Sequence, residues 1–523
     1  MSEFAPPTFA LTRWLFLRLL AVVFLIAFVS YGVQLDGLIG SRGILPAADL
    51  MSSVQGLGAN GVWRLPTLCW LGTSDAFLHA LAAGGTLLSL LLLAGVGDGL
   101  VLLLLWAVYL SLVVVGQTFF SFQWDILLLE TAFTSLFLAG WTLRPRLPSA
   151  QEHVPRAGLW LVRALLFKLM FLSGITKLLC LDPTWWKLTA LDHHYVTQPL
   201  PVWTSYYAHH LPHGFQRASV AVMFAIELGA PFLLFMPRRF RITGALAVIG
   251  FMGLIAGTGN YGFFNLLTAV LCVTWLDDAF LLRLVPARWR APLQSRLRRD
   301  PAVRAESGRT GALRAGRLAY GLAIAAMAYA SSLTLVEEMV RTRPSGRIGG
   351  LPGTLLDYGA TYVAAGRGML AVVSPFRSIS GYGLFRSMTT SRPEIAIETS
   401  DDGVSWHEVA FRYKPGDVDR RPRFVAPHQP RLDWQMWFAA LDPRRAEPWL
   451  VRLMRRMLEG SPAVLRLLDD KTLLAKPPRY VRLVMYEYGF TTLPEAEATG
   501  GAWWKRERRG ELTAALSLDS FRR

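Results

Sequence analysis

Gly257-Thr-Gly-Asn-Tyr-Gly-Phe-Phe-Asn265 separates two apolar stretches of the sequence, residues 242–257 and 263–281. The wider segment from Trp203 to Asp278 also contains a His-rich loop, an apolar helix with Glu227, and a cluster of arginines. Polar groups at membrane depth are costly unless another group pairs or solvates them. The segment therefore predicts a working site inside an integral membrane protein.

The composition of the whole chain supports a membrane-embedded fold. Of its 523 residues, 53% are apolar, which is more than in a typical soluble protein. A helix needs about 20 apolar residues to cross the hydrocarbon core of a bilayer. The sequence contains stretches for about nine transmembrane helices by this length criterion. They cover residues 12–33, 76–94, 99–118, 123–140, 159–182, 216–236, 242–257, 263–281 and 317–335.

The positive charge of the chain predicts its orientation. The formal net charge is +17, but the basic residues lie in alternate loops, as the positive-inside rule requires, and not in a nucleic-acid-binding pattern. With the N-terminus in the cytoplasm, the outer loops contain only Arg42, Arg64 and Lys187. The inner loops contain Arg13, Arg144, Arg146, Arg156, Arg238, Arg239, Arg241 and nine arginines from Arg283 to Arg314. An odd number of spans then places residues after 336 outside the cytoplasm.

The first apolar run is long and lacks a small-residue cleavage site, so it predicts a signal anchor that stays in the mature chain. Three cysteines, Cys69, Cys180 and Cys272, are too few for a disulfide framework. These features favour the bacterial cytoplasmic (inner) membrane, or the endoplasmic reticulum membrane if the source is a eukaryote.

The composition becomes that of a soluble domain after the last span. A Gly-rich stretch at 345–353 predicts a linker between a membrane domain, 1–340, and an extracytoplasmic domain, 345–523. Alternating residues at 394–399 and 404–413 around the turn Asp401-Asp402-Gly403 predict a β-hairpin. Two helical patterns at 446–469 precede a further strand at 480–488. This domain is predicted to be α+β and β-sandwich-like.

Familiar catalytic motifs are absent from the sequence. It has no G-x-S-x-G, Walker A or H-E-x-x-H pattern, and Gly56-Leu-Gly58-Ala-Asn-Gly61 lacks the preceding strand of a dinucleotide site. The pairs His193-His194 and His209-His210 have no carboxylate or Cys at ligand spacing. We therefore predict no cofactor and no metal site.

Charged residues within the predicted spans are candidates for a polar cavity or for structural ion pairs. A rise of 1.5 Å per residue places Lys177 level with Asp125 or Glu130, and Lys168 level with Glu227. The two lysines lie on opposite faces of one helix, so at least one is expected to be structural. The other cavity candidates are His193, His194, His209, Asn260 and Asn265.

From Phe120-Ser-Phe-Gln-Trp-Asp-Ile-Leu-Leu-Leu-Glu-Thr131 onward, the chain resembles the lipase maturation factor family, as a bacterial-type member. Further matching blocks are Thr197-Gln-Pro-Leu-Pro201, Glu227-Leu-Gly-Ala-Pro-Phe232, Pro237-Arg-Arg239, Thr258-Gly-Asn-Tyr261, Leu276-Asp-Asp278, Tyr413-Lys-Pro-Gly-Asp417 and Pro427-His-Gln-Pro-Arg-Leu-Asp-Trp-Gln-Met-Trp437. The resemblance covers nearly the whole chain.

The resemblance implies a multi-span membrane protein whose C-terminal domain helps dimeric lipases to fold and which needs no catalytic residue. Membrane lipids and an exported lipase, or another secreted client, are the expected partners, with no nucleic acid. The Trp and Pro clusters of the C-terminal domain favour packing. Client binding is the alternative for His428, Arg431, Asp433, Trp434 and Trp437.

A second resemblance supports an alternative function. Ser173-Gly-Ile-Thr-Lys-Leu178, followed by Trp185, is similar to the lysine-bearing helix end of vitamin K-dependent γ-carboxylase-like membrane proteins. It implies that Lys177 is a catalytic base in an integral membrane enzyme that modifies a lipid or a peptide. A lysine in low dielectric has a lowered pKa and so can accept a proton.

Overall fold

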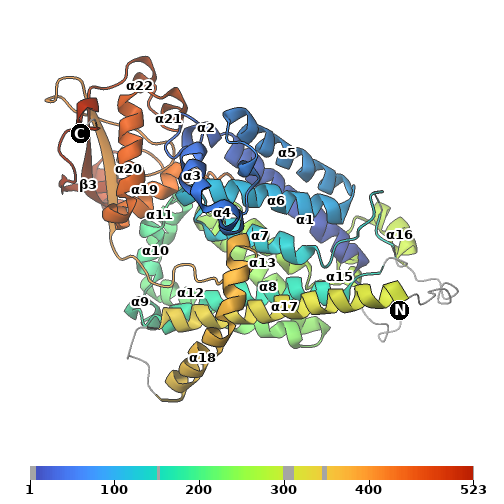
Figure 1. The fold of residues 1–523 in the computed structure, drawn as a ribbon. Helices are drawn as coiled ribbons and strands as arrows, with labels where there is room; N and C mark the ends of the chain where they lie inside the picture. Colours follow the sequence, from blue (N-terminus) through green and yellow to red (C-terminus); the bar gives the residue numbers. More distant parts are fainter. Residues whose placement is uncertain (1–7, 146, 150–152, 298–310, 344–349, 522–523) are drawn as a thin grey trace.

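The fold was analysed in a computed structural model that describes residues 8–145, 147–149, 153–297, 311–343 and 350–521. A bundle of long helices forms most of the molecule, and a small α+β domain covers one end of it (Figure 1). We call this the outer end. The opposite, inner end carries the start of α1 (Ala10–Gly32), α15 (Asp278–Leu284) and α16 (Ala287–Arg296).

Within the described residues, seven helical stretches are long and apolar enough to cross a membrane. They confirm seven of the predicted spans, usually within four residues at each end. They are α1 (Ala10–Gly32), α5 (Asp75–Ala94), α6 (Asp98–Val115), α8 (Arg156–Leu179), the stretch His213–Phe235, α13 (Arg238–Thr258), and residues 316–342 of α17 (Gly311–Thr342).

The other two predicted spans differ from simple transmembrane helices, so the count of nine is not confirmed. The helix α7 (Gln123–Ser135) begins at the predicted residue but ends at Ser135, so it has only 13 residues. The stretch 263–281 consists of α14 (Phe264–Val273) and α15, which are bent by 118° at their junction. Asp277 caps the start of α15 through the Phe280 amide, and this cap fixes the second direction.

The stretch His213–Phe235 changes helical type along its length. It begins as α12 (His213–Phe224), continues as one turn of π-helix at Ala225–Gly229, and ends as a 3₁₀-helix at Ala230–Phe235. Pro231 removes a backbone donor in this region. Single π-helical turns commonly mark functional or strained positions, and here the turn contains Glu227.

Short helices occupy the loops at the outer end. They are α2 (Leu35–Leu38), α3 (Ala47–Val54), α4 (Gly58–Arg64), α9 (Pro183–Trp186), α10 (Leu191–Thr197) and α11 (Trp203–His209). The loop between α6 and α7 contains a 3₁₀-helix, Gln117–Phe120. These loops form the surface that the C-terminal domain covers.

The C-terminal domain contains one antiparallel sheet with the order β2-β1-β3-β4 in its described residues. The strands are β1 (Arg392–Ser400), β2 (His407–Glu408), β3 (Tyr480–Phe490) and β4 (Trp504–Glu511). The predicted hairpin is present, although its second strand is two residues long. Helices pack where a second sheet of a sandwich was expected: α19 (Arg431–Leu441) lies against β1, and α20 (Pro443–Leu458) contacts β3. Three short helices complete the domain: α21 (Pro462–Leu465), α22 (Thr472–Ala475) and α23 (Leu493–Ala498).

The predicted Gly-rich linker is helical from residue 350 onward, and its first residues, 345–349, lie outside the described part. The helix α18 (Gly350–Val373) crosses α17 (Figure 1), where Gly366 lies against Leu333. Residues 374–388, which we call the return segment, then contact α6, α7, α8 and α9. The chain therefore packs on the bundle before it enters the sheet.

Candidate functional site at the interface between the bundle and the C-terminal domain

A buried ion pair lies at the centre of the interface. The guanidinium group of Arg431, at the start of α19, donates to both carboxylate oxygens of Asp125 on α7, each at 2.8 Å. The hydroxyl of Tyr109 on α6 also donates to Asp125, and the carbonyl of Phe119 accepts from Arg431. Arg431 is 1% exposed and Asp125 is fully buried. Removal of either charge would leave the other charge buried without a partner.

The end of α1 contributes polar groups to the same interface. Gln34 donates to the carbonyl of Gln429 at 2.8 Å and accepts from the Arg431 amide at 2.9 Å. The Ser30 hydroxyl is 2.9 Å from the His428 ring and accepts from the Gln429 amide. Burial, with the charges of Arg431 and Arg412, lowers the pKa of His428. Burial at the interface therefore favours the neutral form of His428, beside backbone groups that are hydrogen-bonded.

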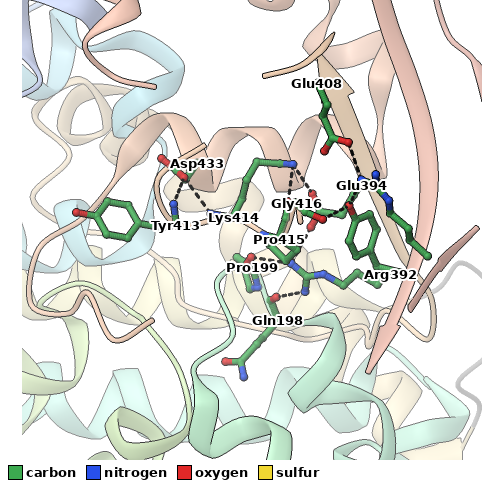
Figure 2. Close-up of polar contacts among 12 residues, drawn as sticks. Gln198, Pro199, Arg392, Glu394, Glu408, Tyr413, Lys414, Pro415, Gly416 and Asp433 are labelled. Atoms are coloured by element: carbon green, nitrogen blue, oxygen red, sulfur yellow. Dashed lines mark hydrogen bonds and ion pairs between the residues drawn. The ribbon is translucent and has the colours of Figure 1, made fainter. Parts of the chain in front are cut away.

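A second buried arginine fixes the sheet to the loop before α11 (Figure 2). Arg392, at the start of β1, donates to the carbonyls of Val196, Gln198 and Pro199 and to the carboxylate of Glu394. Glu394 also lies 3.3 Å from the ammonium group of Lys414. The sequence analysis missed Arg392. The sign of its role in the sequence is its position just before the alternating residues 394–399 of the predicted strand.

Asn260, a predicted cavity residue, joins the two parts of the chain and does not face an open cavity. Its side-chain amide donates to the carbonyls of Leu200 and Arg423, and its oxygen accepts from the amides of Val425 and Ala426. All four hydrogen bonds that an Asn side chain usually makes are therefore formed.

The candidate client-binding residues lie inside the interface. Arg431, Asp433, Trp434 and Trp437 are at most 8% exposed, and His428 is partly buried. Asp433 accepts from the amides of Tyr413 and Lys414 (Figure 2), and Trp437 donates to the carbonyl of Thr197. The rings of Trp434 and Trp124 are 4.8 Å apart. In this structure the four buried residues pack within the interface, and client binding by them stays a prediction.

The pairs of intramembrane charges predicted from their levels were wrong. Lys168 pairs with Glu130, and Lys177 pairs with Glu227. Helical side chains lean toward the N-terminus of their own helix. Because α8 and the stretch His213–Phe235 run in opposite directions, Lys177 on α8 and Glu227 in the π-helical turn lean toward each other. The prediction of levels from the rise per residue also assumed that all spans end at one membrane surface. In the structure, the start of α7 is instead covered by α19.

Glu130 has a second set of partners in the return segment. Its carboxylate accepts from the Ser380 amide at 3.0 Å and from the Tyr382 hydroxyl at 2.7 Å. Non-helical backbone within a membrane bundle is tolerated where protein groups satisfy its hydrogen bonds. The Lys168–Glu130 pair therefore has a structural explanation, because it holds the return segment against α7 and α8.

Lys177 is poorly arranged to act as a base. Its ammonium group donates to the two carboxylate oxygens of Glu227 at 2.9 and 2.7 Å and to the carbonyl of Ser173 at 2.9 Å. These acceptors take all three donors of an ammonium group. A lysine held in this way has no free lone pair for proton abstraction, so the geometry does not favour the alternative enzyme function.

The candidate histidines line the loops at the outer end. His194 lies 3.0 Å from the hydroxyl of Tyr261, which also donates to Gln198. Burial, and then the charges of His210 and His193, lower the pKa of His209 to about 4. Asn265 is 7% exposed, and among the described residues its side-chain oxygen has no hydrogen-bond partner. Of these residues, His194 lies near enough to Lys177 for the lysine's charge to act on its ring, whereas Asn260 is bonded to backbone groups of the two parts of the chain.

The fold and the interface define a polytopic helical membrane protein with a C-terminal sheet domain docked on its outer end. Two family models match the chain: the lipase maturation factor transmembrane domain over residues 11–283, and the lipase maturation factor C-terminal domain over residues 378–514. The chain therefore belongs to the lipase maturation factor family. Arg431 and Asp125, which form the central ion pair, lie in different matched domains.

Relatives match over almost the whole chain. Lipase maturation factor 2 of Rattus norvegicus is 36% identical, with 96% of this chain and 83% of the relative covered. Lipase maturation factor 1 of Homo sapiens is 33% identical, with 98% of this chain and 89% of the relative covered. No solved structure matches. These matches do not support the γ-carboxylase-like resemblance or the bacterial type, since both relatives are animal lipase maturation factors.

Proposed function

We propose that this chain assists the maturation of a secreted lipase and has no catalytic role. The observation that carries this proposal is similarity along the full chain to proteins named lipase maturation factors, across both the helix bundle and the sheet domain. The occupied Lys177 adds support, because the strongest candidate for a catalytic group is already paired with Glu227.

We further propose that the N-terminus is cytoplasmic and that the client meets the C-terminal domain outside the cytoplasm. The sheet domain contacts loops that the charge pattern assigns to the outside, including those with Arg42, Thr118 and Thr197. The described arginines of the 283–314 loop, including those of α16, lie at the opposite end (Figure 1). In a eukaryotic cell the outside compartment would be the lumen of the endoplasmic reticulum.

We propose two functional parts, residues 1–340 and 345–523, of which the second begins with a stretch packed on the bundle. The helix α18 and the return segment make this contact through Gly366, Ser378 and Tyr382. The motif from Pro427 to Trp437 then positions the sheet domain. Client contacts are therefore sought on the exposed face of the sheet domain, away from this motif.

The function can be tested in cells that lack their own lipase maturation factor. Co-expression of this chain with a secreted lipase is expected to raise the activity per mass of secreted lipase. The double variant Lys177→Met/Glu227→Met replaces the buried pair by apolar groups and should retain this effect, because such replacements are often neutral. No rise in lipase activity, with a correctly folded chain, would contradict the proposal. Loss of the effect only in the folded double variant would instead support a chemical role for Lys177.

A further inference from the structure

An apolar cavity of about 360 Å³ lies between two pairs of helices in the bundle. Trp106 of α6 and Phe133 of α7 form one side, and Ala326 and Met327 of α17 face them. Met369 of α18 and the start of the return segment complete the lining, and the cavity is partly open to the surroundings. It occupies the seam between α6 and α7 on one side and the α17–α18 pair on the other.

The polar side-chain atoms of the lining are already used. The indole nitrogen of Trp106 donates to the Ser378 hydroxyl at 2.8 Å, and that hydroxyl donates to the carbonyl of Phe376, also at 2.8 Å. The other lining side chains carry no hydrogen-bonding group or only the thioether of methionine. Water needs two to four polar partners to occupy a cavity, whereas apolar cavities stay dry and accept hydrocarbons. The chemistry of the lining therefore selects a hydrocarbon.

The helices around the cavity face the membrane, whose lipid acyl chains are an abundant hydrocarbon. Residues 316–342 of α17 and residues 98–115 of α6 are membrane-spanning stretches. Near the cavity, Leu322 is 62% exposed on α17 and Val372 is 50% exposed on α18, as expected for side chains that face lipid. The medium at the opening is therefore the acyl region of the bilayer.

The size of the cavity fits one chain. An apolar cavity of roughly 150 Å³ accepts one benzene molecule of six carbons. By the same scale, about 360 Å³ holds on the order of a dozen methylene carbons. This is a large part of one acyl chain and too little for two chains or for a transmembrane helix about 10 Å across.

We propose that one acyl chain of a membrane phospholipid occupies this cavity and fills the seam between α6–α7 and α17–α18. This inference is independent of the proposed function. Its consequence is that the position of α18 and the return segment, and with them the entry to the sheet domain, depends on a bound lipid.

The proposal can be tested with the full chain in nanodiscs. The probe is a phosphatidylcholine with a diazirine group near the middle of one acyl chain. After illumination, cross-links are expected on Trp106, Phe133 and Met369 in excess of those on the exposed leucines of α5. Ala326→Phe fills the cavity and should reduce these cross-links several-fold. Ala328→Phe, an exposed position on the same helix that does not line the cavity, should leave them unchanged.

Three results would overturn the proposal. Equal labelling of α5 and of the cavity residues, unchanged in folded Ala326→Phe, would mean that only bulk lipid contacts the protein. Labelling of the cavity residues well below that of α5 would mean that a group other than lipid, such as a helix of a second copy, occupies the cavity. If Ala326→Phe fails to fold, the smaller change Ala323→Leu replaces it as the cavity-filling variant. The wild-type labelling pattern is then also used. Labelling that is not enriched at the cavity residues contradicts the proposal.

Discussion

The two ends of the helix bundle use similar charged groups in different ways. At the inner end, Asp277 pairs with Arg238 and Arg241, and Asp278 accepts from the amides of Ala10 and Thr12. All of these partners lie within the membrane domain, and the side chain of Arg238 is 43% exposed. At the outer end, Arg431 and Asp125 are buried and come from different domains. The inner charges thus fix the ends of helices, whereas the outer charges hold one domain on another.

The largest effect is expected from a change that removes one charge of the outer pair. Arg431→Met leaves Asp125 buried without its cation, and breaking a buried pair in this way typically costs about 3 to 5 kcal/mol. Thermal unfolding of the full chain in detergent should show this loss, and protease cleavage near residues 374–392 should become faster. Arg431→Met/Asp125→Asn should recover part of the stability. An unchanged unfolding temperature in the single variant would show that the domain is held mainly by other contacts.

A smaller effect is expected at the inner end. Asp277→Asn keeps a cap acceptor for the Phe280 amide but removes the charge that faces Arg238 and Arg241. Because Arg238 remains accessible to solvent, the expected loss is about 1 to 3 kcal/mol, typical of hydrogen bonds to charged groups. The same unfolding assay measures it, and the cleavage rate at 374–392 should not change. Faster cleavage there would break the proposed division between the two ends.

The sequence predicted the inner end better than the outer end for a physical reason. Span lengths and arginine positions depend on local composition, so α1, α5, α6 and α8 were found from single apolar runs. The pairing of Arg431 with Asp125 joins residues 306 positions apart, and no local pattern contains that information. The polar residues Ser30 and Gln34 at the end of an apolar span were a usable sign of an interface.

The partners within the membrane could not be predicted from levels alone. The level prediction paired Lys177 with Asp125 or Glu130 and Lys168 with Glu227, whereas in the structure Lys177 pairs with Glu227 and Lys168 with Glu130. The direction in which each side chain leans and the covered start of α7 decide the pairs. Both depend on neighbours that only the folded chain brings together.

A pH effect of intermediate size is expected near the outer end at His194. Burial, reinforced by the charge of Lys177, lowers the pKa of His194 from 6.5 to about 4. The unfolded chain therefore binds a proton between these pH values that the folded chain does not bind, so stability is complete above pH 6.5 and falls as pH decreases toward 4. His194→Gln should remove this part of the pH dependence. Because His209 titrates in the same range, the test is the difference between the two unfolding curves, and parallel curves would contradict it.

The smallest effect is expected for a second ion pair between the domains at the outer end. Arg452 on α20 lies 3.1 Å from Asp49 on α3, and their side chains are 48% and 58% exposed. Exposed pairs contribute about 0 to 1 kcal/mol, since water already solvates both charges and salt screens them. Arg452→Met should therefore leave the unfolding temperature and the cleavage rate at 374–392 almost unchanged, and any small loss should disappear in high salt. Like Arg431→Met, Arg452→Met removes the guanidinium group of an ion pair that joins the two domains. The two pairs differ in burial, so comparing the two variants tests the effect of burial. If Arg452→Met were as damaging as Arg431→Met, the number of contacts between the domains, and not the burial of the central pair, would determine how they are held together.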